Sequence, residues 1–138
     1  MKPLAIVLAA GGSTRMGRPK ALLPLPEGRT LLQAWIHRLQ PHCRVCVVTG
    51  ATDLPLPPGV EGRVNPDWET TGMRESLLCG LAGRPSQAAL ITPVDVPPCT
   101  EVELRRLMAC AGSAVLSWRG QPGHPVRLGA AALVRLRE

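Results

Sequence analysis

An apolar run that passes directly into a glycine-rich, basic segment constrains the fold of this chain most. Residues 4–8 form a short apolar stretch of the kind that makes a buried β-strand. The residues that follow, A-A-G-G-S-T-R-M-G-R-P-K at 9–20, combine three glycines with hydroxyl groups and cations. Glycine allows backbone N–H groups to approach a ligand closely, and such groups cradle phosphate oxygens. The pattern therefore predicts a strand followed by a loop that binds a nucleotide polyphosphate, with Arg15 and Lys20 neutralising its charge.

Two widespread phosphate-binding motifs do not match this segment. A Walker A loop requires a lysine and then a hydroxyl residue after its second glycine, whereas G-R-P stands at 17–19. A dinucleotide-binding fingerprint requires G-x-G-x-x-G and an acidic residue near the end of the second strand. Here Gly11 and Gly12 are adjacent, and the second predicted strand, 45–49, is followed by Gly50 rather than by an acid. Both of these classes of nucleotide-binding protein are therefore excluded.

The length and the charge of the chain limit the kinds of partner that we expect it to bind. The 138 residues suit a single domain, and no apolar stretch approaches the ~20 residues of a membrane span. We therefore expect a cytoplasmic domain without membrane contact. The formal net charge of +6 suits an anionic partner, but the chain has no Phe or Tyr and only three Trp. Because proteins that bind single-stranded nucleic acid stack bases on aromatic side chains, we expect no nucleic-acid partner.

The five cysteines do not form a pattern typical of a metal or redox site. Cys43 and Cys46 have the spacing of half a zinc site or of a redox pair. The run 43–48 is predicted to be a strand, however, in which residues three apart point to opposite faces. No second pair stands at the spacing of a zinc ribbon. We therefore interpret the cysteines as small buried apolar residues in a reducing cytosol.

Strand and helix signals alternate along the chain, which is typical of an α/β domain with a largely parallel sheet. Thr100 and Glu103 form a capping box that begins one of the helices. A loop that contains Gly120, Pro122 and Gly123 is expected between the last two strands. The predicted strands are 4–9, 45–49, 60–64, 88–92, 114–118 and 125–128, and the predicted helices are 30–39, 72–81, 100–111 and 130–137.

A single acidic residue, Asp95, follows the apolar strand 88–92. It stands in the segment T-P-V-D-V-P, whose prolines force extended geometry on the residues before them. Because ligands of open α/β sheets bind beyond the carboxyl ends of the strands, we expect Asp95 and the glycine-rich loop to share one crevice. A lone carboxylate beside a phosphate loop is suited to holding Mg²⁺ together with phosphate oxygens. The alternative is an aspartate that caps a turn.

Four segments stand along the chain in this order: L-A-A-G-G-S-T-R-M-G-R-P-K at 8–20, N-P-D-W at 65–68 with Gly72 and Ser76-Leu77, T-P-V-D-V-P at 92–97 and G-H-P-V at 123–126. Together they resemble the MobA-like nucleotidyltransferases, and the branch that they resemble most is the molybdenum cofactor cytidylyltransferases. The resemblance extends from residue 3 to about residue 128. It implies a three-layer, Rossmann-like nucleotidyltransferase fold over one domain, 1–138. The family pattern continues with a further acidic motif of the D-x-D-T-P type, so we expect this chain to lack the usual C-terminal metal-binding segment.

The resemblance also implies a reaction and its partners. It implies a Mg²⁺-dependent transfer of a nucleotidyl group, CMP rather than GMP, from the NTP to a phosphorylated acceptor, with release of pyrophosphate. GMP is the second choice for the transferred group, and the implied acceptor is molybdopterin. L-A-A-G at 8–11 resembles the cytidylyl branch, whereas guanylyl members typically carry L-A-G-G, so CTP is favoured. Contact with a molybdoenzyme or chaperone is a further expectation. The alternatives are a non-catalytic nucleotide- or cofactor-binding domain of the same fold, a nucleotidyltransferase for a sugar or polyol phosphate, and a basic interaction module.

Residue roles follow from the same match. The resemblance assigns catalysis to Arg15, Lys20 and Asp95, with Asp95 as the metal ligand. For Trp68, a role in filling a gap beneath a loop is the alternative, and for His124 it is a hydrogen bond to nearby backbone. The residues expected to bind the nucleotide are Leu8, Ala9, Ala10, Gly11, Gly12, Ser13, Arg15 and Lys20, and those expected on the acceptor side are His124, Asn65, Trp68 and Ser76.

Overall fold

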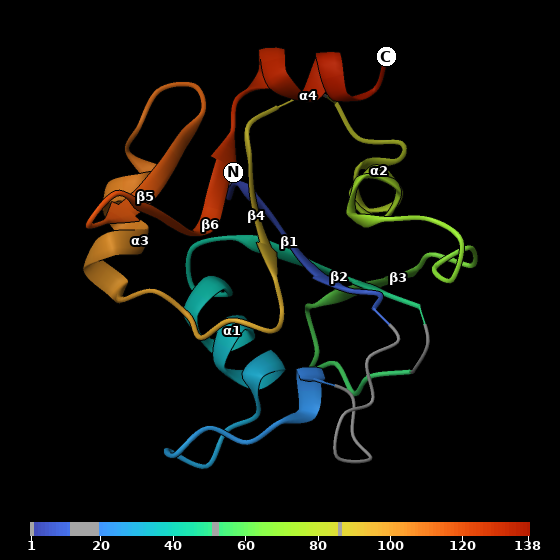
Figure 1. Ribbon diagram of the computed structural model, residues 1–138, viewed down its shortest axis with the longest axis vertical. Coiled ribbons are helices and arrows are strands. Elements are labelled where there is room, and N and C mark those ends of the chain that lie inside the picture. Colours follow the sequence, from blue (N-terminus) through green and yellow to red (C-terminus); the bar gives the residue numbers. More distant parts are fainter. Residues whose placement is uncertain (1, 12–19, 51–52, 86) are drawn as a thin grey trace.

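Strands and helices alternate along the chain, as the sequence predicts (Figure 1). The computed structural model describes residues 2–11, 20–50, 53–85 and 87–138. None of the helices formed by these residues has the length and apolar character needed to cross a bilayer. The elements are β1 (Leu4–Ala9), the short 3-10 helix η2 (Lys20–Leu22), α1 (Leu31–Leu39), β2 (Arg44–Thr49), β3 (Glu61–Val64), α2 (Met73–Leu81), β4 (Ala89–Pro93), α3 (Glu101–Met108), β5 (Ala114–Trp118), β6 (Gln121–Leu128) and α4 (Ala130–Leu136).

Six strands in the described part of the chain form one sheet in the order β3-β2-β1-β4-β6-β5. The strands β3, β2, β1 and β4 are parallel to one another, whereas β6 is antiparallel to both β4 and β5. The predicted α/β class with a mostly parallel sheet is therefore confirmed. Leu8 lies opposite Val48 on β2 and opposite Pro93 on β4. The carboxyl ends of β1, β2 and β4 consequently meet at one edge of the sheet.

Helices cover both faces of the sheet and make three layers (Figure 1). Because successive strand residues point to opposite faces, each strand contributes to two cores. On β1, Ala5 and Val7 belong to the core that holds α1 and α3, whereas Leu4 and Ile6 belong to the core that holds α2 and α4. Trp35 is fully buried in the first core, where its indole N–H donates to the Val96 carbonyl at 2.7 Å.

The two closely spaced cysteines lie in different cores. Cys43 packs in the core with α1 and α3, and Cys46 packs in the core with α2 and α4. Both are buried free thiols. The predicted separation of this pair onto opposite faces is therefore confirmed.

Side-chain caps fix the starts of α1 and α3. Thr30 Oγ1 accepts from the Gln33 N–H, and the Gln33 side chain accepts from the Thr30 N–H, which completes a capping box. Thr100 and Glu103 form the same arrangement at α3. The predicted starts are confirmed, but α3 ends at Met108 rather than near residue 111, because the chain turns there toward β5.

The connection between β5 and β6 is shorter than the sequence suggests. The loop expected between the strands 114–118 and 125–128 is wrong, since β6 begins at Gln121 and pairs it with Trp118. Arg119 and Gly120 both have positive φ, 51° and 78°, as in the two-residue turns whose twist matches that of the flanking strands. His124 therefore lies within a strand and not in a glycine-rich turn.

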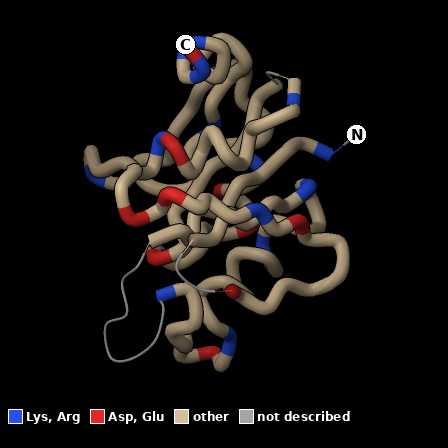
Figure 2. Tube along the Cα trace, turned by 90° about the vertical axis from the view of Figure 1, so that its right-hand side faces the viewer, with Lys and Arg blue, Asp and Glu red and all other residues tan. Residues whose placement is uncertain are grey.

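Charged residues of both signs are interspersed along the described trace (Figure 2). Several of them form ion pairs: Glu61 contacts Arg63 and Arg84, and Glu101 contacts Arg38. The Glu61–Arg84 pair ties β3 to the end of α2, and the Glu101–Arg38 pair ties the start of α3 to α1. Each of these two pairs therefore joins different elements of the fold.

Candidate functional site

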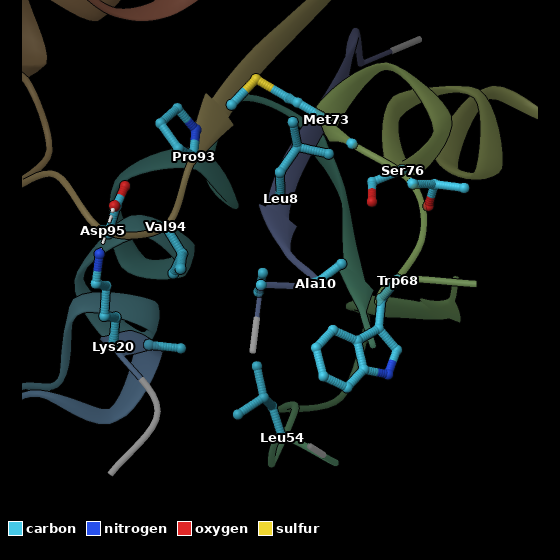
Figure 3. A pocket seen from close by; sticks show the side chains of 15 residues that line it. Leu8, Ala10, Lys20, Leu54, Trp68, Met73, Ser76, Pro93, Val94 and Asp95 are labelled. Carbon is cyan, nitrogen blue, oxygen red and sulfur yellow. Dashed lines mark hydrogen bonds and ion pairs between the residues drawn. The ribbon is translucent and has the colours of Figure 1, made fainter. Parts of the chain in front are cut away.

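A pocket of about 320 Å³ opens at the edge where the parallel strands end. This volume is at the lower end of the range typical of sites for small molecules. Its walls come from the exit of β1, from η2, from the segment that leads into α2 and from the exit of β4 (Figure 3). The topology explains the position, because ligands of open α/β sheets bind beyond the carboxyl ends of the strands.

One end of the pocket carries opposite charges. Lys20 Nζ lies 3.5 Å from Asp95 Oδ2, and their side chains are 37% and 43% exposed. Lys20 begins η2, and Asp95 follows β4, whose exit is held against β1 by the Val94 N–H donating to the Leu8 carbonyl at 3.0 Å. An exposed ion pair of this kind contributes little to stability. Because both side chains are more than one third exposed, both charged groups are accessible to a ligand in the pocket.

The exit of β1 forms the middle of the pocket wall. Residues 8–11 all line it. The side chain of Ala10 is nearly buried, and Gly11 has open space where a Cβ would stand. The small or absent side chains at 9–11 leave room for a ligand to approach the backbone here. Gly12, Ser13 and Arg15, which the sequence assigns to the same loop, lie outside the described residues.

The other end of the pocket is apolar and aromatic. Trp68, Met73, Ser76 and Leu54 line it (Figure 3). Ser76 is buried, with 5% of its surface exposed. The pocket thus combines one charged end with one end that suits a planar organic group.

The remaining two acceptor-side residues do not line this pocket. Asn65 is buried behind the wall, where its side-chain amide donates to Ser76 Oγ at 3.0 Å. His124 is half-buried on β6, and its Nδ1 has no hydrogen-bond partner among the described residues. The structure therefore brings Leu8–Gly11, Lys20 and Asp95 together with Trp68 and Ser76, but not with His124.

Sequence reasoning missed several residues that shape the pocket. Gly50 follows β2, and a Cβ there would lie 2.6 Å from Trp68 Cβ and 2.7 Å from the Ala10 carbonyl oxygen. Only a glycine allows this approach. Leu54 and Val94 line the pocket as well. The signal available for Gly50 was a glycine directly after a buried strand at the edge where the ligand is expected.

The donor set of the pocket suits a cation that takes oxygen ligands. Within the described residues, no group of three or more His, Cys, Asp and Glu side chains is arranged to hold a metal. Among the residues that line the pocket, Asp95 alone carries a carboxylate. A single carboxylate at an accessible pocket mouth fits Mg²⁺ or Mn²⁺, which take their other ligands from phosphate and water. It does not fit a closed zinc site.

Thiolate chemistry is not favoured in this pocket. Burial raises the pKa of the Cys43 thiol to about 11. Burial, together with the charge of Glu103, raises the pKa of Cys99 to about 11 as well. Both thiols are consequently protonated at neutral pH, and neither lines the pocket. The arrangement is suited to binding and neutralising an anionic ligand rather than to forming a covalent intermediate through cysteine.

Fold and pocket together define an α/β domain with a ligand site at the carboxyl edge of a mostly parallel sheet. The chain belongs to the family described as the MobA-like NTP transferase domain, whose model matches residues 5–138. The resemblance noted from the sequence is therefore confirmed at the level of the family.

Relatives in this family carry related names. A probable molybdenum cofactor guanylyltransferase of Rhodopirellula baltica is 31% identical over 132 residues, which cover 86% of this chain and 57% of the relative. A protein of the same name from Mycobacterium tuberculosis is 35% identical, with 86% and 64% covered. The molybdenum cofactor cytidylyltransferase of Escherichia coli is 28% identical, with 88% and 67% covered. The chain thus spans less than two thirds of the length of the first two.

Solved structures share the fold. A nucleotidyl transferase from Methanothermobacter is 27% identical and superposes with a TM-score of 0.72, covering 99% of this chain and 76% of that one. A Mycobacterium tuberculosis protein solved in complex with manganese is 22% identical, with a TM-score of 0.71 and coverage of 99% and 75%. The predicted fold class is confirmed by these likenesses.

Proposed function

We propose that the pocket binds a nucleoside triphosphate and that the protein transfers its nucleotidyl group to a phosphorylated acceptor. Family membership supports the reaction class. One observation carries the assignment to this site: Lys20 and Asp95 lie 3.5 Å apart at one end of a pocket that residues 8–11, at the start of the glycine-rich segment, also line. A cation, a carboxylate and backbone groups in one cleft are what an NTP and its counter-ion require.

The chemistry needs positioning more than a covalent nucleophile. An oxygen of the acceptor phosphate attacks the α-phosphorus of the NTP in line, a new P–O bond forms, and the bond to pyrophosphate breaks. Lys20 Nζ donates to phosphate oxygens and stabilises the negative charge of the leaving pyrophosphate. Arg15 is proposed to act with it. The backbone of residues 8–11 holds the nucleoside in place.

Asp95 is the proposed ligand of a divalent cation. Its carboxylate lies beside Lys20, at the end of the pocket where the triphosphate is proposed to bind. A bound Mg²⁺ supplies charge neutralisation to the phosphate groups. The related fold solved with manganese supports the use of a divalent ion. We propose Mg²⁺ as the ion that this protein uses.

The nucleotide proposed is CTP, with GTP as the second candidate. L-A-A-G at 8–11 supports CTP. The names of the relatives that are 31% and 35% identical support GTP instead. The proposed acceptor is molybdopterin, on the basis of the same relatives. Trp68 and Ser76 are proposed to contact bound substrate because they line the pocket.

Binding and turnover can be tested separately. We expect CTP with Mg²⁺ to raise the melting temperature more than the other three NTPs, and CTP with molybdopterin to release pyrophosphate. Asp95→Ala should abolish the release, whereas Glu27→Gln, which removes an exposed charge outside the pocket, should leave it unchanged. Binding of CTP without product from any acceptor would favour the non-catalytic alternative.

The role of Lys20 has its own test. Lys20→Met should weaken binding of CTP by about tenfold or more, because a charge-assisted hydrogen bond is lost, but should leave binding of cytidine unchanged. Isothermal titration measures both affinities. An equal loss for the triphosphate and the nucleoside would show that Lys20 does not contact the phosphates.

A further inference from the structure

A hydrogen-bonded side chain lies directly behind the aromatic end of the pocket. Asn65 follows β3, has 5% of its surface exposed and donates its backbone N–H to the Thr49 carbonyl at 2.8 Å. Its side-chain amide donates to Thr71 Oγ1 at 3.1 Å and to Ser76 Oγ at 3.0 Å. Its Oδ1 accepts from the Asp67 N–H at 3.0 Å. Every polar atom of this side chain is thus engaged.

These bonds span the whole connection between β3 and α2. Asp67 stands near the start of that loop, Thr71 stands near its end, and Ser76 lies in α2 itself. Thr71 Oγ1 also donates to the Asp67 carbonyl at 2.7 Å, which closes the loop on itself. Gly72, the N-cap of α2, makes no side-chain cap bond. Asn65 therefore links both ends of the loop to the beginning of the helix.

The loop that Asn65 holds is the aromatic wall of the pocket. Trp68, Thr71 and Ser76 line the pocket, whereas Asn65 itself does not. We infer that Asn65 is a positioning residue: it fixes Trp68 and the start of α2 against the strand edge, and so sets the shape of the pocket end that receives the planar part of the ligand. The effect on ligand binding rests on the proposed nucleotide site.

The same helix offers a matched control at its other end. Arg63, on β3, donates from one guanidinium nitrogen to the carbonyls of Cys79, Gly80 and Ala82 at 3.0, 3.2 and 2.7 Å. These contacts hold the C-terminal end of α2, away from the pocket. Arg63→Met thus removes anchoring of the same helix by the same strand without touching the aromatic wall.

Tryptophan fluorescence reports the wall directly. In a Trp118→Phe background, the remaining tryptophans are Trp35, which is fully buried, and Trp68 in the pocket wall. We expect Asn65→Ala to shift the emission to the red and to increase quenching by acrylamide, because Trp68 loses its fixed place. We also expect it to raise the Kd for CTP by about tenfold, because the three side-chain hydrogen bonds that fix the wall are lost. Arg63→Met should lower the melting temperature and change neither the tryptophan fluorescence nor the Kd for CTP.

Each outcome decides the inference. Unchanged emission, quenching and Kd in folded Asn65→Ala would overturn it, and so would equal effects of Arg63→Met, since helix stability alone would then explain the loss. If Asn65→Ala does not fold, Thr71→Val removes only one of the three side-chain bonds of Asn65, together with the bond from Thr71 to the Asp67 carbonyl. It should shift the emission in the same direction by less; no shift would overturn the inference. If the unmodified pocket binds no NTP, the proposed function fails, while the quenching comparison still decides the role of Asn65.

Discussion

Gly50 shows how one missing side chain can shape a pocket. Its Cα faces Trp68 and the Ala10 carbonyl so closely that a Cβ would lie 2.6 and 2.7 Å from them. The backbone of Gly50 has no positive φ, so the requirement is for space and not for an unusual conformation. The end of β2 thereby allows the exit of β1 and the loop before α2 to meet.

Gly50→Ala is expected to damage both packing and binding. The added methyl must displace Trp68 or the Ala10 backbone, so we expect a loss of roughly 1–3 kcal/mol in the free energy of unfolding and weaker binding of CTP. Chemical denaturation and titration measure these. Gly123→Ala is the matched control, because its Cβ would meet only ordinary contacts at 3.6 and 3.7 Å. Equal stability of the two variants would contradict the steric explanation.

Element starts are specified by local side-chain chemistry. Thr100 caps α3 through its bond from the Glu103 N–H at 3.2 Å, and this helix packs Leu104 and Leu107 into the core beside α1. We expect Thr100→Ala to lower the free energy of unfolding by about 1 kcal/mol, the typical cost of a lost N-cap. Thr100→Ser keeps the hydroxyl, so its free energy of unfolding should stay close to that of the unmodified protein. A Ser variant as unstable as the Ala variant would show that the methyl group, and not the cap, matters.

The sequence predicts some elements of this structure better than others. Capping boxes and apolar periodicity involve neighbours in the chain, which explains why the starts at Thr30 and Thr100 are correct. The meeting of Lys20 and Asp95 follows from strand topology, although their roles stay predictions. The placement of His124 failed because the Arg119-Gly120 turn is shorter than the surrounding glycine and proline residues suggest. The partners of the Asn65 side chain lie up to 11 residues away in the sequence, and no periodic pattern marks them.

At the scale of the whole molecule, contacts between elements make two carboxyl groups more acidic than usual. Partial burial raises the pKa of Glu61, but hydrogen bonds from Arg84 and Arg63 outweigh it, so the pKa lies below its usual range. The hydrogen bond with His42 lowers the pKa of Glu101. Both groups are therefore more acidic in the folded chain than in the unfolded one.

These shifts predict a loss of stability in acid. Glu103 is also more acidic than usual, because it accepts from the Thr100 N–H. Since the folded state binds fewer protons than the unfolded state, stability is fully present above the usual pKa of 4.5 and falls as pH drops below it. Denaturation curves between pH 7 and pH 3 should show this loss of stability. The free energy of unfolding of Glu61→Gln should depend less on pH over that interval. Parallel curves for the two proteins would argue against a contribution from Glu61.

The short strand β3 has one more consequence. It forms an outer border of the sheet, is four residues long and carries two charged side chains, Glu61 and Arg63. An edge strand presents backbone N–H and C=O groups that can pair with a strand of another molecule, and short strands with charged side chains discourage such pairing. The ionic contacts that anchor α2 therefore also help to keep concentrated protein from aggregating through this side of the sheet.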